Sequence, residues 1–208
     1  MEDILDLYQQ PFDEDFPVIC MDEKPYQLLD EALNPIPMKP QKPERQDSEY
    51  IRKGTCSIFI FTEPLAGWRH VNVRERRTRI DWAHEVKELL DQSYPNASKM
   101  RLVMDNLNTH SVASLYQAFD PETARRLAKR LEIHYTPKHG SWLNIAEVEL
   151  SAMARQCLGR RIPSIDQLSL ELSEWESARN KNQKSVDWQF TTDDARIKLR
   201  RLYPQFKS

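Results

Sequence analysis

Short apolar runs and longer amphipathic stretches alternate along the chain and predict an α/β domain. Strand-like runs rich in β-branched and aromatic residues occupy five segments: 17–23, 55–62, 68–73, 100–105 and 132–136. Helical spacing of apolar residues occupies six others: 79–93, 111–119, 121–131, 142–158, 164–181 and 191–202. Three strands, then helices alternating with two further strands, predict a mixed five-stranded sheet flanked by helices.

Turn residues and prolines divide these elements. Residues 64–67 are short enough to join two strands as an antiparallel hairpin. Four prolines within residues 34–43 forbid helix there and predict an extended loop. The order of elements fits a ribonuclease-H-like fold, with an N-terminal lead-in at 1–16, a core at 17–160 and a C-terminal helical extension at 161–208.

The composition narrows the class of protein. The chain has 208 residues, 30% of them charged, and a mean hydropathy of −0.72. No apolar run approaches the roughly 20 residues of a membrane span, and the acidic first residues do not resemble a secretory signal. The three cysteines are widely separated and predict reduced core residues. We expect a cytoplasmic protein with no membrane partner.

Charge is distributed unevenly. The net charge is −2, yet residues 1–31 contain ten acidic residues and one basic residue, so the rest of the chain is basic. A basic cluster at Arg74, Arg76 and Arg77 predicts contacts with DNA phosphates, and a solvated protein surface is the alternative. For the cluster at 196–201 we favour the solvated helix face.

Two acids end predicted strands, and others lie in the first turns of a predicted helix. Asp22 closes the run 17–23 and Asp105 closes the run 100–105. In open α/β sheets, ligands gather at the carboxyl ends of strands. Carboxylates that converge there favour Mg²⁺, which keeps open positions for a substrate phosphate. For each Asp taken singly, an ordinary turn residue is the favoured interpretation, and only the convergence of the acids favours a metal site.

Periodicity does not decide which glutamate would complete such a site. In the predicted helix 142–158, an apolar stripe from Trp142 to Cys157 has Glu149 on one flank and Glu147 further round on the other. The two glutamates point about 160° apart, so they are not expected to bind one ion. Helical geometry slightly favours Glu149 as the residue that faces the sheet.

Two ordered motifs are more specific. They are Asp105-Asn106-Leu107-Asn108-Thr109-His110 and the segment from Tyr135 to Glu147, YTPKHGSWLNIAE. With VICMDEK at 18–24, PLAGWRHV at 64–71 and VDWQFTT at 186–192, they resemble bacterial insertion-sequence transposases related to mariner. These are DDE superfamily endonucleases with a ribonuclease-H-like core, and the resemblance covers nearly the whole chain.

The resemblance implies a catalytic and metal-binding triad. Its three acids fall on Asp22, Asp105 and Glu147, which overrides the preference of periodicity for Glu149. It implies Mg²⁺, with Mn²⁺ able to substitute, and cleavage of DNA at transposon ends followed by strand transfer into target DNA. Residues beside the triad are expected to support it or to contact DNA: Asn106, His110, His139, Asn144 and Lys138. For His110, a hydrogen-bonding role at a helix start is an equal alternative.

The resemblance also implies partners. We expect a homodimer that pairs two transposon ends, nucleoid-associated in a bacterium, and an N-terminal helix-turn-helix module that is separate or missing. The alternatives are a ribonuclease-H-like endonuclease without strand transfer, or an inactive DNA-binding or assembly subunit. Glu23 is expected to be a neighbour of the triad rather than a ligand, and Trp142 a core residue.

Overall fold

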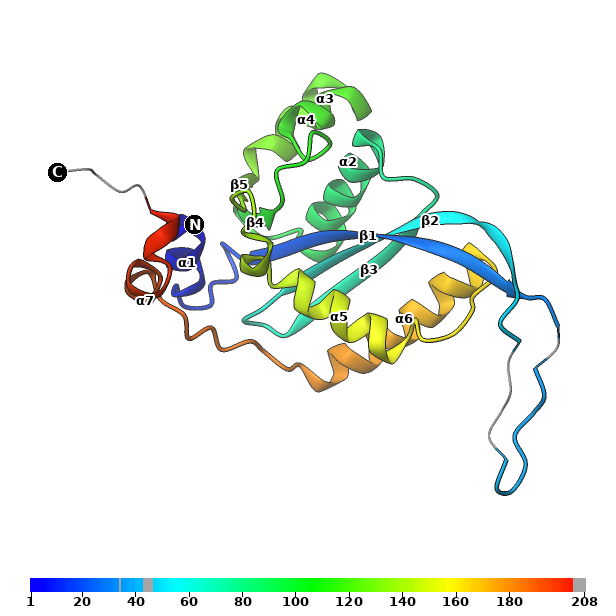
Figure 1. The fold of residues 1–208 in the computed structure, drawn as a ribbon. Coiled ribbons are helices and arrows are strands. Elements are labelled where there is room, and N and C mark those ends of the chain that lie inside the picture. The colour runs from blue at the N-terminus through cyan, green and yellow to red at the C-terminus, as the bar shows by residue number, and fades with distance from the viewer. Residues whose placement is uncertain (34, 43–46, 204–208) are drawn as a thin grey trace.

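The computed structural model describes residues 1–33, 35–42 and 47–203, and its centre is a five-stranded sheet (Figure 1). The spatial order of the strands is β3-β2-β1-β4-β5. β2 is antiparallel to β1 and β3, whereas β4 is parallel to β1 and β5. The mixed five-stranded sheet is therefore confirmed. The strands are β1 (Val18–Glu31), β2 (Tyr50–Glu63), β3 (Trp68–Arg74), β4 (Met100–Met104) and β5 (Leu131–Tyr135).

The central strand β1 is longer than the sequence indicates. It has 14 residues, so the prediction that the strand ends near Asp22 and Glu23 is wrong. β4 pairs with β1 only from Val18 to Cys20, and the rest of β1 pairs with β2 alone. Pro25 is tolerated because a strand stretch with one unpaired side does not need every backbone N–H.

Helices cover both faces of the sheet (Figure 1). Alternate residues of β1 supply two separate cores, because successive strand side chains point to opposite faces. Ile19 and Met21 join the core under the first set of helices, whereas Cys20 joins the core under the second. The first set is α2 (Arg79–Glu88) with the π-helical turn η1 (Leu89–Ser93), α3 (Val112–Ala118) and α4 (Pro121–Lys129). The second set is α5 (Ala146–Gln156) and α6 (Ile165–Asn182).

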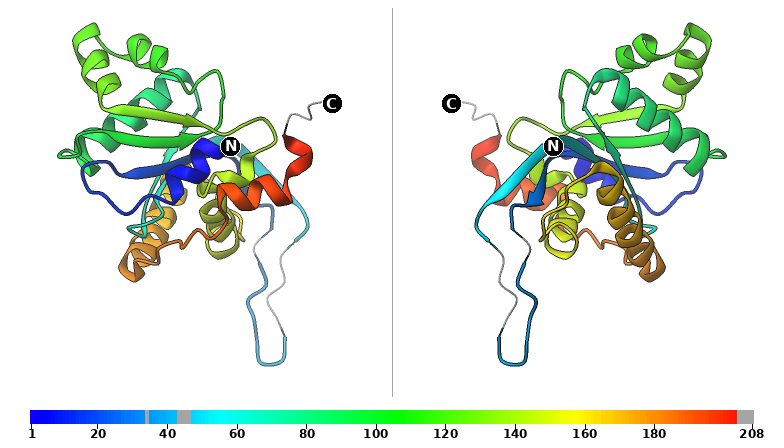
Figure 2. Two further views of the ribbon diagram at one scale, coloured as in Figure 1. Left: turned by 90° about the vertical axis from the view of Figure 1, so that its left-hand side faces the viewer. Right: turned by 90° about the vertical axis from the view of Figure 1, so that its right-hand side faces the viewer.

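The first and last α-helices of the described chain lie side by side (Figure 2). The predicted lead-in contains a helix, α1 (Glu2–Tyr8), which packs against α7 (Thr192–Lys198), ahead of the short turn η3 (Arg200–Leu202). Arg196 Nε donates to Glu2 Oε1 at 2.8 Å across this contact. Ile4 and Leu5 are fully buried in the same core as α5. The first residues are thus part of the packed fold.

The described residues between β1 and β2 extend away from the sheet (Figure 1). None of them is helical, as the prolines predict, and Lys39 pairs with Lys42 across a tight turn. Positions 34 and 43 of the predicted loop, and the last five residues of the predicted extension, lie outside the described residues. Among the described helices, none combines the length and the apolarity needed to cross a membrane.

Tyr8 supplies a test of how firmly α1 is packed. Its hydroxyl donates to the Leu143 carbonyl at 2.7 Å and lies 3.1 Å from Cys20 Sγ. We expect Tyr8→Phe to lower the free energy of unfolding by about 1 to 2 kcal/mol, because the buried carbonyl loses its donor. Urea denaturation measures this. Tyr116→Phe is the control, since Tyr116 is 48% exposed; equal values for the two variants would contradict the packing role.

Candidate active site

The pairing register brings Asp22 and Asp105 to neighbouring positions. The last paired residues of the parallel strands β1 and β4 are Cys20 and Val103. Asp22 and Asp105 each follow two residues later, and adjacent strands lie only about 5 Å apart. β4 ends at this point whereas β1 continues, so the two carboxylates flank an opening at the end of β4.

Glu147 comes to the same region from α5. A 3₁₀ turn, η2 (Ser141–Leu143), leads into this helix, and Asn144 fixes the junction. The Asn144 side chain is 3% exposed, donates to the Met21 carbonyl at 2.8 Å and accepts from the Ala146 N–H at 3.2 Å. Asn144 therefore ties the start of α5 to β1 one residue before Asp22. Glu147 lies in the first helical turn, where the helix dipole favours an acid.

The acids are close enough to affect one another. Burial, together with the negative charges of Asp105, Glu147 and Glu23, raises the pKa of Asp22 to about 6. The Glu23 backbone N–H, which donates to Asp22 Oδ1 at 2.7 Å, opposes this rise. Within the described residues, no three acid, histidine or cysteine side chains converge into a complete ligand set. The donor set itself, carboxylate oxygens with like charge, suits a hard divalent cation.

His110 lies between two acids behind this opening. Its Nδ1 is 2.6 Å from Asp105 Oδ1 and its Nε2 is 2.8 Å from Glu23 Oε1. Burial lowers the pKa of His110, but the hydrogen bonds to Asp105 and Glu23 outweigh it and raise the pKa to about 9. The ring is therefore an imidazolium at neutral pH, which hydrogen-bonds Glu23 Oε1 through Nε2 and forms an ion pair with the Asp105 carboxylate through Nδ1. His110 contacts the predicted triad through Asp105.

Glu149 has a different role from Glu147. It is 3% exposed and faces the sheet, as periodicity indicates. Arg69 Nη2 donates to it at 3.0 Å and Arg179 Nη2 at 2.8 Å. Burial alone would raise the pKa of Glu149, but these two guanidinium groups hold it below its usual value. Glu149 thus belongs to a buried ion cluster that joins α5 to β3 and α6.

Several of the predicted supporting residues share one hollow with Asp105. Its volume is about 650 Å³, and it opens between the end of β4 and the segment after β5. Cationic, amide, hydroxyl and apolar groups surround it. Its lining comprises Asp105, Asn106, Leu107, Tyr135, Thr136, Pro137, Lys138, His139 and Ser141. The structure therefore brings Asn106, Lys138 and His139 to the same place as Asp105.

The backbone beside this hollow is constrained. His139 has a positive φ of 65°, a left-handed conformation that is uncommon for residues with a side chain. A Cβ on Gly140 would lie 2.6 Å from Pro137 Cγ, so only glycine fits there. This tight turn presents Lys138 and His139, both exposed, at the rim.

The three predicted arginines differ in their surroundings. Arg74, at the end of β3, forms ion pairs with Glu85 and Glu88 of α2. Its charge is thus balanced within the protein. Arg76 and Arg77 lie exposed in the segment that joins β3 to α2. Of the three, these two are better placed to meet an external phosphate.

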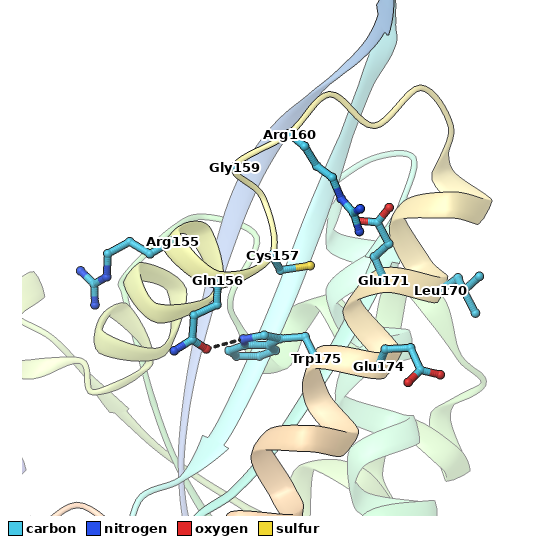
Figure 3. Close-up of a pocket in the computed structure, with 9 residues that line it drawn as sticks. All are labelled: Arg155, Gln156, Cys157, Gly159, Arg160, Leu170, Glu171, Glu174 and Trp175. Atoms are coloured by element: carbon cyan, nitrogen blue, oxygen red, sulfur yellow. Dashed lines mark hydrogen bonds and ion pairs between the residues drawn. The ribbon is translucent and has the colours of Figure 1, made fainter. Parts of the chain in front are cut away.

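A second hollow, of about 720 Å³, lies between the end of α5 and α6 (Figure 3). Trp175 Nε1 donates to Gln156 Oε1 at 2.9 Å on its floor, and Arg160 pairs with Glu171 at its edge. Cys157 also lines it, between the two helices. None of the predicted site residues contributes to it, so the chemistry does not belong here.

Helix α5 begins later than predicted. It starts at Ala146, and Asn144 interrupts the predicted helix 142–158 with an extended ψ of 104°. Trp142 consequently lies outside the helix and is 41% exposed, with its ring against Phe190 at 5.7 Å. The prediction of a core Trp142 is wrong. Asn144 is extended and separates the 3₁₀ turn from α5, so Trp142 does not continue the apolar face of that helix.

Sequence reasoning missed the role of Glu23. A usable signal was present, since a residue next to Asp22 in a strand must point to the opposite face. A buried acid on that face requires a partner, and His110 follows Asp105 at the start of α3 on the same face. Arg69 and Arg179, which neutralise Glu149, gave no comparable local signal.

Comparison with known proteins agrees with this geometry. The family model of the DDE superfamily endonucleases matches residues 17–169. The chain therefore belongs to the DDE superfamily endonucleases. Among curated proteins, none is significantly similar to it.

Solved structures show the same ribonuclease-H-like fold. The Mos1 transposase paired-end complex with left transposon end is 16% identical, with a TM-score of 0.60 over 88% of this chain and 53% of that one. The Mos1 Strand Transfer Complex is 13% identical, with a TM-score of 0.57 over 81% and 49%. The Mos1 mariner paired end complex with Mn is 13% identical, with a TM-score of 0.55 over 88% and 56%. The chain spans about half the length of these proteins.

The raised pKa of Asp22 predicts that replacing its carboxylate increases the stability of the metal-free protein in a pH-dependent way. The folded state binds the Asp22 proton more tightly than the unfolded state, so stability falls as pH rises from about 4 to about 6. We expect Asp22→Asn to stabilise the metal-free protein at about pH 7.5 by roughly 1 to 2 kcal/mol, allowing for partial exposure. Thermal denaturation across pH measures the effect, which should vanish below about pH 4. A destabilised variant at pH 7.5 would contradict the electrostatic account.

The different roles of Glu147 and Glu149 predict different effects of their replacement on the free energy of unfolding. Glu149→Gln leaves Arg69 buried without its carboxylate, so we expect a loss of about 3 to 5 kcal/mol in the free energy of unfolding. Glu147→Gln, whose side chain is partly exposed, should change it by no more than about 0.5 kcal/mol. Urea denaturation of both variants, without metal, provides the comparison. Similar losses would argue against the structural assignment of Glu149.

Proposed function

We propose that this chain is the catalytic domain of a transposase, which cuts DNA at transposon ends and joins the freed 3′ hydroxyl to target DNA. The observation that carries the proposal is the register that sets Asp22 beside Asp105, with Glu147 near enough to raise the pKa of Asp22. Membership of the DDE superfamily endonucleases supports it. The Mos1 structures with a similar fold are a paired-end complex and a strand transfer complex.

The same three carboxylates would hold the metal ions, Mg²⁺ with Mn²⁺ able to substitute. Carboxylate oxygens are the ligands these cations prefer, and the mutual repulsion of the acids is relieved by a cation. Divalent ions supply activation of the attacking oxygen and stabilisation of the leaving oxygen in phosphodiester chemistry. One of the similar Mos1 complexes carries Mn.

The surrounding residues would hold and orient the DNA. Lys138 and His139 stand at the rim of the hollow beside Asp105, where cations can contact the backbone phosphates on either side of the reacting one. Asn106, in the same hollow, offers an amide for hydrogen bonds. Arg76 and Arg77 extend the positive surface, and Asn144 keeps α5 in position against β1. We propose a homodimer, because two transposon ends must be paired for strand transfer.

The test is metal-dependent cleavage of a DNA duplex that carries a transposon end. We expect Asp105→Asn to reduce cleavage by more than about 100-fold, because several kcal/mol of charge stabilisation depend on the metal. Glu147→Gln should show a similar loss. Glu149→Gln, assayed at a temperature at which it stays folded, should lose less activity than Glu147→Gln, because its side chain affects the proposed metal site only through the position of α5.

Two outcomes would point to other functions. Cleavage without any joining of the 3′ end to a second duplex would indicate an endonuclease without strand transfer. DNA binding without cleavage, unaffected by Asp105→Asn, would indicate a non-catalytic binding subunit. Retained cleavage in Asp105→Asn would refute the triad.

A further inference from the structure

Glu23 is a buried acid that the triad does not use. It points to the face of β1 opposite Asp22, under α2 and α3, and its side chain is 2% exposed. Oε1 is bonded to His110, and Oε2 is buried with no hydrogen-bond partner among the described residues. Within the described structure, His110 is thus the one cation paired with Glu23.

His110 in turn organises the loop that carries Asp105. Besides the Asp105 carboxylate, its Nδ1 lies 3.3 Å from the Asp105 carbonyl, and its backbone N–H donates to the Leu107 carbonyl at 3.0 Å. The Tyr135 hydroxyl donates to the His110 carbonyl at 2.8 Å. The His110 ring is 1% exposed and lies 6.0 Å from the ring of Trp82. The loop between β4 and α3 is therefore arranged around one buried side chain, that of His110.

We infer that Glu23 and His110 form a positioning pair that fixes the Asp105 carboxylate in its place beside Asp22. The inference rests on the proposed function, in which Asp105 is a metal ligand. Asp105 follows the last residue of β4 and has a side chain 43% exposed, so pairing with β1 does not hold it. The buried Glu23 holds the ring of His110 at Nε2, and this leaves Nδ1 directed at Asp105.

The arrangement explains why an acid follows Asp22 directly. Because adjacent strand residues face opposite sides, one dipeptide of β1 supplies a triad acid on one face and its indirect support on the other. A neutral residue at 23 would leave the His110 ring with one carboxylate partner instead of two. The ring could then rotate, and Asp105 with it.

The test compares Mn²⁺ binding, measured by electron paramagnetic resonance without DNA, among single variants. We expect Glu23→Gln and His110→Gln each to weaken Mn²⁺ binding by roughly 10- to 100-fold. Glu63→Gln is the matched control, because Glu63 is also buried on this face of the sheet, where it accepts from the Tyr94 hydroxyl at 2.7 Å. It should bind Mn²⁺ as the unchanged protein does.

A second readout does not depend on metal. Ring N–H protons that are buried in hydrogen bonds give downfield proton signals in nuclear magnetic resonance spectra. In the metal-free protein, Glu23→Gln should shift or remove the Nε2–H signal of His110, and Glu63→Gln should leave it in place. The double variant Glu23→Gln/His110→Gln should bind Mn²⁺ no more weakly than the weaker single variant, because the two residues act in series.

The outcomes separate this inference from the proposed function. If Asp105→Asn abolishes Mn²⁺ binding while Glu23→Gln binds like the unchanged protein, the positioning pair is refuted and the triad stands. Additive losses in the double variant would also refute it. If Asp105→Asn binds Mn²⁺ normally, the proposed function fails and the inference fails with it.

Discussion

The change of partners along β1 is the constraint on which the site depends. From Val18 to Cys20 the strand pairs with β4, and from Cys20 onward it pairs with β2, so only Cys20 has a partner on both sides. The sheet therefore loses strand β4 where β1 continues beside β2, and Asp22 and Asp105 lie at this point. Ligands of open α/β sheets bind beyond the carboxyl ends of strands, where backbone and side chains are accessible. In this sheet β4 ends beside an inner part of the long strand β1, and this makes Asp22 accessible although it does not lie at the end of its own strand.

The buried cluster around Glu149 performs a second task, because it sets the rotation of α5. Arg69 comes from β3 and Arg179 from α6, so the carboxylate of Glu149 is fixed toward that side of the molecule. Residues two apart in a helix point about 160° away from each other. Fixing Glu149 against the two arginines thus directs Glu147 to the other side, toward Asp22. The glutamate that periodicity favours is structural, and its burial is what makes the other one available.

Local pattern was sufficient for the order of the five strands and of the helices from α2 to α7, and for the end of β4 next to Asp105. It was insufficient where distant groups decide the outcome. The length of β1 depends on pairing with β2, and the burial of Ile4 depends on α5 and α7, so neither is visible in a short window of sequence. The choice between Glu147 and Glu149 required Arg69, 80 residues away along the chain. Resemblance to a family indicated Glu147 before any physical reason for it was available.

The charges around Asp22 show why the site is suited to a cation from solution. Burial and the charges of three further acids raise the pKa of Asp22, and the buried His110 is paired with Asp105 and Glu23. Among the described residues, no basic side chain forms an ion pair with Asp22 or Glu147, so the site keeps an excess of negative charge. Folded proteins carry such unfavourable groupings mainly at functional sites, where stability is given up for binding. In the proposed mechanism, the same excess attracts divalent ions first, and the ions then make it possible for a polyanion such as DNA to approach.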